Sequence, residues 1–338
     1  MTHGKMKRVI VLVILVLSVL PAVVKAQQIP LYSQYTMNKY LLNPAYAGSQ
    51  GYTSYNLTAR QQWMGFGNAK TPSTQAICAQ TRVLQNNLLA NLGLVDRGMS
   101  RRRTSGRVGM GGYIFNDRNG IINRTGIQGT YAYHIPLSDL QQLSFGVSGT
   151  VYQFKLDDEN IKLPDDDLGV PDPLVHGREN SMFVPDATAG IYYMNNNFHI
   201  GVSGMNLFQS VLKFGSDQSY SSYQLLRHYY LMTSYQYELD GDFTLEPSLL
   251  FKSTERKNLQ ADISMKAYYQ GDYWMGLSYR TGSALISKVG VKVDNIYFGY
   301  AYDYSLREIQ KLTYGSHEIM VGIRFGDSNR RTRFQRRF

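Results

Sequence analysis

The sequence IYFGYAYDY at positions 296–304, together with HEIMVGIRF at positions 317–325, decides the fold class. In both stretches, large apolar or aromatic residues alternate with small, polar or charged ones. Successive side chains of a β-strand point to opposite faces of the sheet, so each stretch predicts a strand with one apolar face. A soluble β-sandwich would give the same alternation. Tyrosines that cap the apolar face, and charges in mid-strand on the other face, favour a membrane barrel with its apolar side toward lipid.

The same alternation recurs along most of the chain. Fourteen strand-like runs cover residues 52–63, 73–83, 107–116, 121–135, 142–156, 184–194, 198–208, 227–238, 243–253, 258–269, 273–280, 284–293, 296–304 and 317–325. We therefore predict an all-β fold, a transmembrane, antiparallel, up-and-down β-barrel of about 14 strands over residues 52–326.

Charged residues in the middle of these runs are predicted to face the lumen. A charge on the lipid side near the bilayer midplane costs roughly 2–4 kcal/mol, so the inward face is the favourable place for it. The predicted lumen charges are Glu246, Lys252, Asp262, Lys266, Arg280, Lys288, Lys292, Asp303, Glu318 and Arg324. They would suit either a water-filled channel or a plugged interior with ion pairs.

Composition agrees with a barrel and argues against a helical membrane protein. Hydrophobic residues make up an ordinary 43% of the chain, while tyrosine (27) and glycine (31) are frequent. This profile is typical of membrane strands with tyrosine belts and small lumen residues. The single cysteine, Cys78, excludes an internal disulfide and is interpreted as a small apolar strand residue.

The N-terminal residues 1–26 have the form of a signal peptide. Lys5, Lys7 and Arg8 precede an apolar run at 9–20, and small residues end the segment at Ala26, where we expect cleavage. The apolar run is too short for a membrane anchor. We predict export to the cell outer membrane, which makes nucleic acid an improbable partner.

The next segment, residues 27–51, does not alternate. It holds several apolar and aromatic residues and an Asn43-Pro44 turn signal, so we expect it to pack into or beneath the barrel as a periplasmic or plug segment. A loose N-terminal arm is the alternative.

Loop lengths and charges give the barrel a direction. The connections at 157–183, 209–226 and 305–316 are long and fall on the same end, as expected outside the cell. The long connection 84–106, an exception, is assigned to the periplasmic end, as is the basic tail 327–338. We predict that arginines in these two segments dock an acidic partner or anionic lipid headgroups, although solvated loops are the alternative. They are Arg101, Arg102, Arg103, Arg330, Arg331, Arg333, Arg336 and Arg337.

The sequence gives no sign of an enzyme or of a cofactor. It contains no Gly-x-Ser-x-Gly nucleophile turn, no His-Glu-x-x-His and no phosphate-binding loop. An active site at the barrel rim has only His228 and Asp303 in its favour. Asp165, Asp166, Asp167 and Asp172 could attract calcium but lack EF-hand spacing, so no metal site is predicted.

Several short motifs, in order along the chain, resemble the PorP/SprF family of outer-membrane proteins from Bacteroidetes. They lie at 34–35, 43–48, 60–66, 116–120, 132–134, 185–186, 227–230, 302–303 and 316–319. The resemblance implies a non-enzymatic component of the type IX secretion system, which also serves gliding motility in some members. It implies periplasmic ring and lipoprotein subunits as partners, and a large adhesin-like secreted cargo. The alternative function is a porin-like channel for small solutes. The insertion at 84–106 and the arginine-rich tail depart from the family pattern.

Overall fold

The computed structural model of the chain describes residues 32–66, 71–83, 107–120, 122–138, 140–156, 181–216, 219–255 and 258–326. The first strands in it are β1 (Thr53–Gln61), β2 (Ser73–Val83), β3 (Val108–Asn119), β4 (Ile122–Ser138), β5 (Gln141–Leu156), β6 (Ser181–Met194), β7 (Phe198–Met205), β8 (Val211–Ser216) and β9 (Ser219–Gln224). The later strands are β10 (His228–Tyr235), β11 (Tyr237–Asp240), β12 (Phe243–Thr254), β13 (Leu259–Tyr269), β14 (Tyr273–Arg280), β15 (Ala284–Val293), β16 (Ile296–Ser305) and β17 (Ser316–Phe325).

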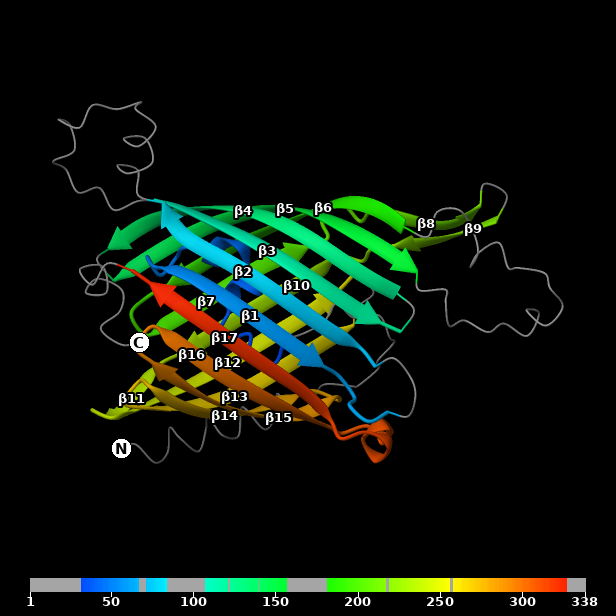
Figure 1. The fold of residues 1–338 in the computed structure, drawn as a ribbon. Coiled ribbons are helices and arrows are strands. Elements are labelled where there is room, and N and C mark those ends of the chain that lie inside the picture. The colour runs from blue at the N-terminus through cyan, green and yellow to red at the C-terminus, as the bar shows by residue number, and fades with distance from the viewer. Residues whose placement is uncertain are drawn as a thin grey trace, which may run out of the picture.

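These strands form a closed antiparallel barrel (Figure 1). The first strand pairs with the last, β1 with β17, and β10 pairs with both β7 and β12, so the wall has no open edge in the described part of the chain. Strands β10 and β11 both pair with β12 and are separated only by Gln236, so they are two halves of one wall strand. The described wall therefore has fourteen strands, and the predicted barrel is confirmed.

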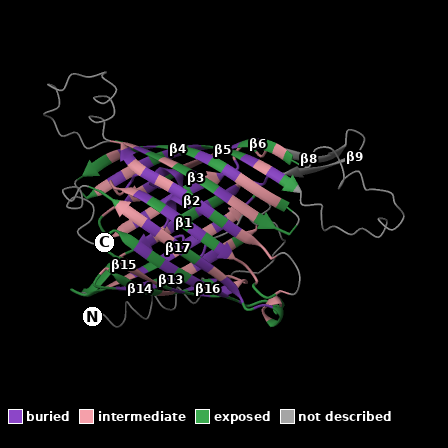
Figure 2. Cartoon of the chain, in the orientation of Figure 1, coloured by how far each residue is buried: buried purple, intermediate pink, exposed green. Residues whose placement is uncertain are grey.

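Burial alternates along each strand as the sequence pattern predicts (Figure 2). On β16, Phe298 and Tyr300 are exposed on the outside of the wall, whereas Tyr297 and Ala301 are buried on the inside. The outward residues are mostly apolar because this surface faces lipid, which cannot hydrate a polar side chain. Among the described residues, no helix is long and apolar enough to cross a membrane.

The two ends of the barrel differ in their connections. At one end, named here the turn end, β4–β5, β6–β7, β11–β12, β13–β14 and β15–β16 are joined by short turns, and Thr53 of β1 lies opposite Phe325 of β17. The other end, named the loop end, carries most of the longer connections, although the long β2–β3 connection leaves the wall at the turn end. These include the short helix η5 (Glu308–Leu312) and the β8–β9 hairpin, which extends beyond the wall in Figure 1.

The β8–β9 hairpin is the main departure from the sequence prediction. The sequence predicts a connection without strands over 209–226, but the segment contains these two six-residue strands, which pair only with each other among the described strands. Strands of this length carry little periodicity, so the pattern that reveals the wall strands is too short here to be read. The other differences are small: β3, β4 and β6 extend about three residues past the predicted bounds, β1 and β7 end two or three residues before them, and the predicted strand 227–238 is broken at Gln236.

Residues 32–51, named here the plug, lie inside the barrel (Figure 1). They form two short 3-10 helices, η1 (Lys39–Leu41) and η2 (Pro44–Tyr46), and most of their side chains are buried. Pro44 starts η2, where its missing N–H removes no hydrogen bond, and the extended Asn43 before it accepts a hydrogen bond from the N–H of Ala45.

The wall makes room for the plug with glycines on its inward face. A Cβ added at Gly146 would lie 2.2 Å from the backbone nitrogen of Ala45, and one added at Gly109 would lie 1.9 Å from the carbonyl oxygen of Ala47. Both distances are far inside van der Waals contact, so the backbone of η2 rests directly against the wall at these positions.

Candidate functional site: the plugged lumen

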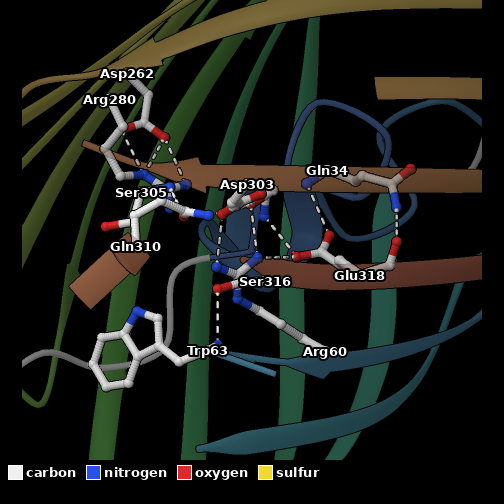
Figure 3. A network of polar contacts seen from close by, with 11 residues as sticks. Gln34, Arg60, Trp63, Asp262, Arg280, Asp303, Ser305, Gln310, Ser316 and Glu318 are labelled. Atoms are coloured by element: carbon white, nitrogen blue, oxygen red, sulfur yellow. Dashed lines mark hydrogen bonds and ion pairs between the residues drawn. The ribbon is translucent and has the colours of Figure 1, made fainter. Parts of the chain in front are cut away.

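A buried ion network joins the plug to the line where the first and last strands meet (Figure 3). Arg60 on β1 contacts Asp303 on β16, with 2.7 Å between Nη2 and Oδ2, and Glu318 on β17, with 3.2 Å between Nη1 and Oε2. Arg280 on β14 extends the network, because its guanidinium lies 2.9 Å from Asp262 and 3.4 Å from Asp303. We name these five side chains, together with Ser33 of the plug, the clasp.

Strand register places the clasp residues together. Arg60 lies directly opposite Glu318 in the β1–β17 pair, and Asp262 lies directly opposite Arg280 in the β13–β14 pair. Opposite residues of an antiparallel pair have their Cβ atoms about 4.5–5.5 Å apart, so inward-facing partners of opposite charge meet without strain.

The plug enters the clasp through its backbone. The N–H groups of Ser33 and Gln34 donate to the two carboxylate oxygens of Glu318, at 2.7 Å and 2.9 Å. The Ser33 hydroxyl donates to Asp303 and accepts from Arg60 Nη1 at 2.8 Å. Asp303 and Glu318 therefore each have both an arginine and a plug donor, and Asp262 has Arg280. Buried charges are stable when they are paired and hydrogen-bonded in this way.

A second group of contacts lies deeper in the lumen. Lys39 of the plug lies 3.8 Å from the carboxylate of Glu246, and Tyr268 donates to that carboxylate at 2.7 Å. The Lys266 ammonium donates to the plug hydroxyl of Thr36 at 3.2 Å and lies 5.0 Å from the centre of the Tyr268 ring. Lysine charges are thus held by an acid, hydroxyl groups and aromatic faces.

The turn end of the plug is fixed by hydrogen bonds to its backbone carbonyl groups. His134 makes a hydrogen bond to the carbonyl of Ala47 at 3.0 Å and to the Ser144 hydroxyl at 2.8 Å. Arg82 donates to the carbonyl of Ser49 at 3.3 Å. The plug is therefore held along its length, from Ser33 in the clasp to Ser49 near the turn end.

The ten predicted lumen charges all lie on the inward face of the wall. Asp262, Arg280, Asp303 and Glu318 belong to the clasp, and Glu246 and Lys266 to the deeper group. The Lys288 ammonium lies 5.3 Å from the centre of the Tyr35 ring of the plug, and Lys252 is buried. Arg324 lies over the rings of Tyr52 and Tyr297, and Lys292 pairs with the half-exposed Asp272 at the turn end.

The other predicted sites either lie outside the described residues or have their side chains buried and bonded in the lumen. The arginines of 84–106 and of the tail, and the acidic run at 165–172, lie outside the described residues, as does the signal peptide. His228 is buried and bonded to the carbonyl of Leu226, and Asp303 is held by two arginines, so the two are not a rim site. Within the described ranges, no three His, Cys, Asp or Glu side chains group closely enough to hold a metal ion.

Sequence reasoning missed three of the residues that hold the plug. The bonding partners of Arg60, Arg82 and His134 are far away in the chain, so no nearby residue indicates their role. Two signals were present in the sequence. Arg60 and His134 fall in the family-like motifs at 60–66 and 132–134, and Arg60 and Arg82 fall on the inward phase of their strands, where a charge needs a partner.

Comparison with known proteins gives one match to a family. The family model described as "Type IX secretion system membrane protein PorP/SprF" matches residues 24–323. A search of curated proteins found no match.

Solved structures with similar folds include the P. putida toluene transporter TodX, with 9% identity and a TM-score of 0.49 over 86% of this chain and 94% of that one. Another is the Acinetobacter baumannii outer membrane protein Omp33, with 7% identity and a TM-score of 0.41 over 82% and 99%. The KdgM porin in complex with disordered oligogalacturonate has 9% identity and a TM-score of 0.36 over 81% and 99%. No conclusion about function follows from similarities this distant.

Proposed function

The chain belongs to the PorP/SprF family of type IX secretion system membrane proteins, and we propose that it is a non-enzymatic outer-membrane barrel that anchors periplasmic subunits of the secretion machine or assists a particular cargo. Display of adhesin-like cargo, and gliding motility in a host that glides, are the finer roles that this family membership suggests. The expected host is a bacterium of the Bacteroidetes.

The observation that supports a scaffold over a solute channel is the filled lumen. The plug is bonded to the wall at the clasp, at Glu246 and at His134, and its aromatic side chains Tyr40 and Tyr46 are buried within the barrel. A channel for small solutes needs a wet path, with polar groups bonded to water. Here the charged groups at the clasp, and Glu246 and Lys266 beyond it, are bonded to the plug or to one another, which argues against the porin-like alternative.

The direction of the barrel is also part of the proposal. Short turns face the periplasm in outer-membrane barrels and longer loops face outward. On this rule the turn end is periplasmic, and the connection between β2 and β3 and the tail after β17 both leave the wall at this end. The arginines of those segments would then be offered to acidic surfaces of ring subunits or to headgroups.

A deletion strain tests the secretory role. Loss of the gene should abolish type IX export or the surface display of a particular cargo, and the wild-type gene should restore it. Export and display that remain at the wild-type level would contradict the proposal.

Conductance in planar bilayers tests the alternative with purified protein. The intact barrel should be silent, and steady conductance from the intact chain would favour the channel. A pull-down from detergent-solubilised membranes should recover periplasmic subunits, and a barrel that recovers none would count against anchoring.

A further inference from the structure

The outer wall carries a hollow that the secretory role does not use. It has a volume of about 1,040 Å³ and crosses six neighbouring wall strands, from β10 through β12, β13, β14 and β15 to β16. This size lies at the top of the range of small-molecule sites, roughly 300–1,000 Å³. We name it the wall groove.

Two parallel rows of outward side chains form the sides of the wall groove. Strand register places Leu249, Ile263 and Tyr279 next to one another in one row. In the other row, Pro247, Met265 and Leu277 are neighbours in the same way. Most of these side chains are apolar, and Met265 and Leu277 are exposed on the outside of the wall.

Serines on the inward face lie behind the floor of the wall groove. Ser248, Ser264 and Ser278 are opposite one another in register and are buried, so between the two outward rows they present only backbone to the outside. The floor of the wall groove is therefore strand backbone, and its sides are the outward side chains of the two rows.

The neighbouring strand is interrupted beside the wall groove. Pairing of β12 passes from Ser248, opposite Ser234 of β10, to Leu245, opposite Tyr237 of β11, so Pro247 lies in the unpaired step between them, across from Tyr235. Proline has no N–H to donate to a strand ladder, which makes a gap in the partner strand a suitable place for it.

The wall groove runs obliquely across the membrane. At β16 it lies beside Asp303, two residues from the loop-end terminus Ser305, whereas at β10 it lies at Ser234, six residues from the loop-end terminus His228. Six strands about 4.8 Å apart give a length of roughly 24 Å. With strands tilted by about 45°, this length covers roughly 17 Å of depth, close to half of the ~30 Å hydrocarbon core.

We propose that the wall groove is a binding site for an acyl chain of a membrane lipid, which stays bound while lipids elsewhere on the wall exchange. The groove faces the bilayer interior, its sides are apolar, and its depth matches one leaflet. The phenols of Tyr302 and Tyr304 lie at its loop end, where tyrosine hydroxyls meet the headgroup region. The lipid would therefore come from the leaflet at the loop end.

Exposure within the wall groove shows where it is recessed. Leu277 is 70% exposed, more than Ile77, Ile127 and Val147 on the opposite wall, whereas Leu249 and Ile263 are only partly exposed. An acyl chain laid along Leu249 and Ile263 would therefore contact side chains of the groove on both flanks. The proposal requires that the barrel faces a bilayer, but not that it serves secretion.

Lipid retention by the purified full-length protein tests the proposal. The protein is extracted from its own membrane in a mild detergent, exchanged repeatedly into detergent without lipid, and the remaining lipid is measured by mass spectrometry. We expect about one acyl lipid per wild-type barrel. Phenylalanine in place of Ser287, a small outward residue in the groove, should fill part of the site. Each displaced methylene weakens retention about fourfold, so loss of two or more should lower it at least about tenfold.

The matched control is Gly149→Phe. Gly149 on β5 faces outward on the opposite wall with no atom within 4 Å of an added Cβ, so this variant adds the same side chain outside the groove and should retain lipid like wild type. Heat-modified mobility in gel electrophoresis verifies that both variants are folded. The proposal is overturned if wild type retains no lipid above the exchange background, if both variants retain equal amounts, or if a protein occupies the groove instead.

Discussion

Removal of Arg60 is the sharpest test of how the plug is held. Arg60→Met deletes the cation that lies 2.7 Å from Asp303 and 3.2 Å from Glu318, while it keeps an unbranched side chain of similar length. The side chains of Arg60 and Asp303 are each 4% exposed and that of Glu318 is fully buried. Two carboxylates would then share a dry site.

The size of the stability loss depends on the contacts that Asp303 and Glu318 keep in the variant. Loss of one partner of a buried pair costs about 3–5 kcal/mol, because an uncompensated charge is left inside. Asp303 keeps Arg280 at 3.4 Å, and Glu318 keeps the N–H groups of Ser33 and Gln34. We therefore expect the lower part of this range, a fall of about 3 kcal/mol in the free energy of unfolding.

Reversible urea unfolding in lipid vesicles measures this change, with fluorescence of Trp63 and Trp274 as the signal. The matched control is Lys292→Met, which breaks the 3.6 Å pair with the half-exposed Asp272 and should cost only about 0–1 kcal/mol. The double variant Arg60→Met with Glu318→Met should be less destabilised than the sum of the two single variants by about 0.5–3 kcal/mol, since it leaves neither charge alone. Simple additivity, or an Arg60→Met effect no larger than the control, would refute the reasoning.

Three further predictions concern the plug and the basic tail. Deletion of residues 32–51 should convert the silent barrel into a conducting one in planar bilayers; a silent deletion variant that still inserts would show that the plug does not close the lumen. Gly146→Leu places atoms where η2 lies and should lower the free energy of unfolding by about 1–3 kcal/mol in the urea assay, whereas Gly149→Leu, which faces outward, should change it little. Glutamine at the five tail arginines should reduce recovery of periplasmic subunits in a pull-down at physiological salt without loss of barrel insertion, and equal recovery would reject docking by the tail. These are Arg330, Arg331, Arg333, Arg336 and Arg337.

The wall of this barrel can be predicted from sequence because lipid imposes its pattern locally. A strand such as β16 reveals its outward face within ten residues, since every second side chain must be apolar, and no information from distant residues is needed. The same alternation predicts that Asp303 and Glu318 face inward, where both are buried. The strands of the β8–β9 hairpin have only six residues each, too few for an alternating pattern to be recognised.

The clasp could not be predicted, because its contacts join residues far apart in the chain. Ser33 and Glu318 are separated by 285 positions, and nothing near either residue indicates the other. The register of β1 against β17 brings Arg60 to Glu318, and that register exists only once the barrel has closed. The inward position of Arg60 indicates that it needs a partner of opposite charge, but it does not identify that partner.

The composition of the plug explains why the lumen charges pair mainly with one another. Residues 32–51 contain a single charged residue, Lys39, and otherwise offer hydroxyl, amide and backbone groups. Such a segment can donate to carboxylates, as Ser33 and Gln34 do to Glu318, but apart from Lys39, which pairs with Glu246, it has no charge to neutralise them. In a filled lumen, where water does not screen charge, neutralisation has to come from the wall. The pairing of Arg280 with Asp262, and of Arg60 with two acids, is therefore a consequence of a nearly uncharged plug, and a water-filled lumen would not require it.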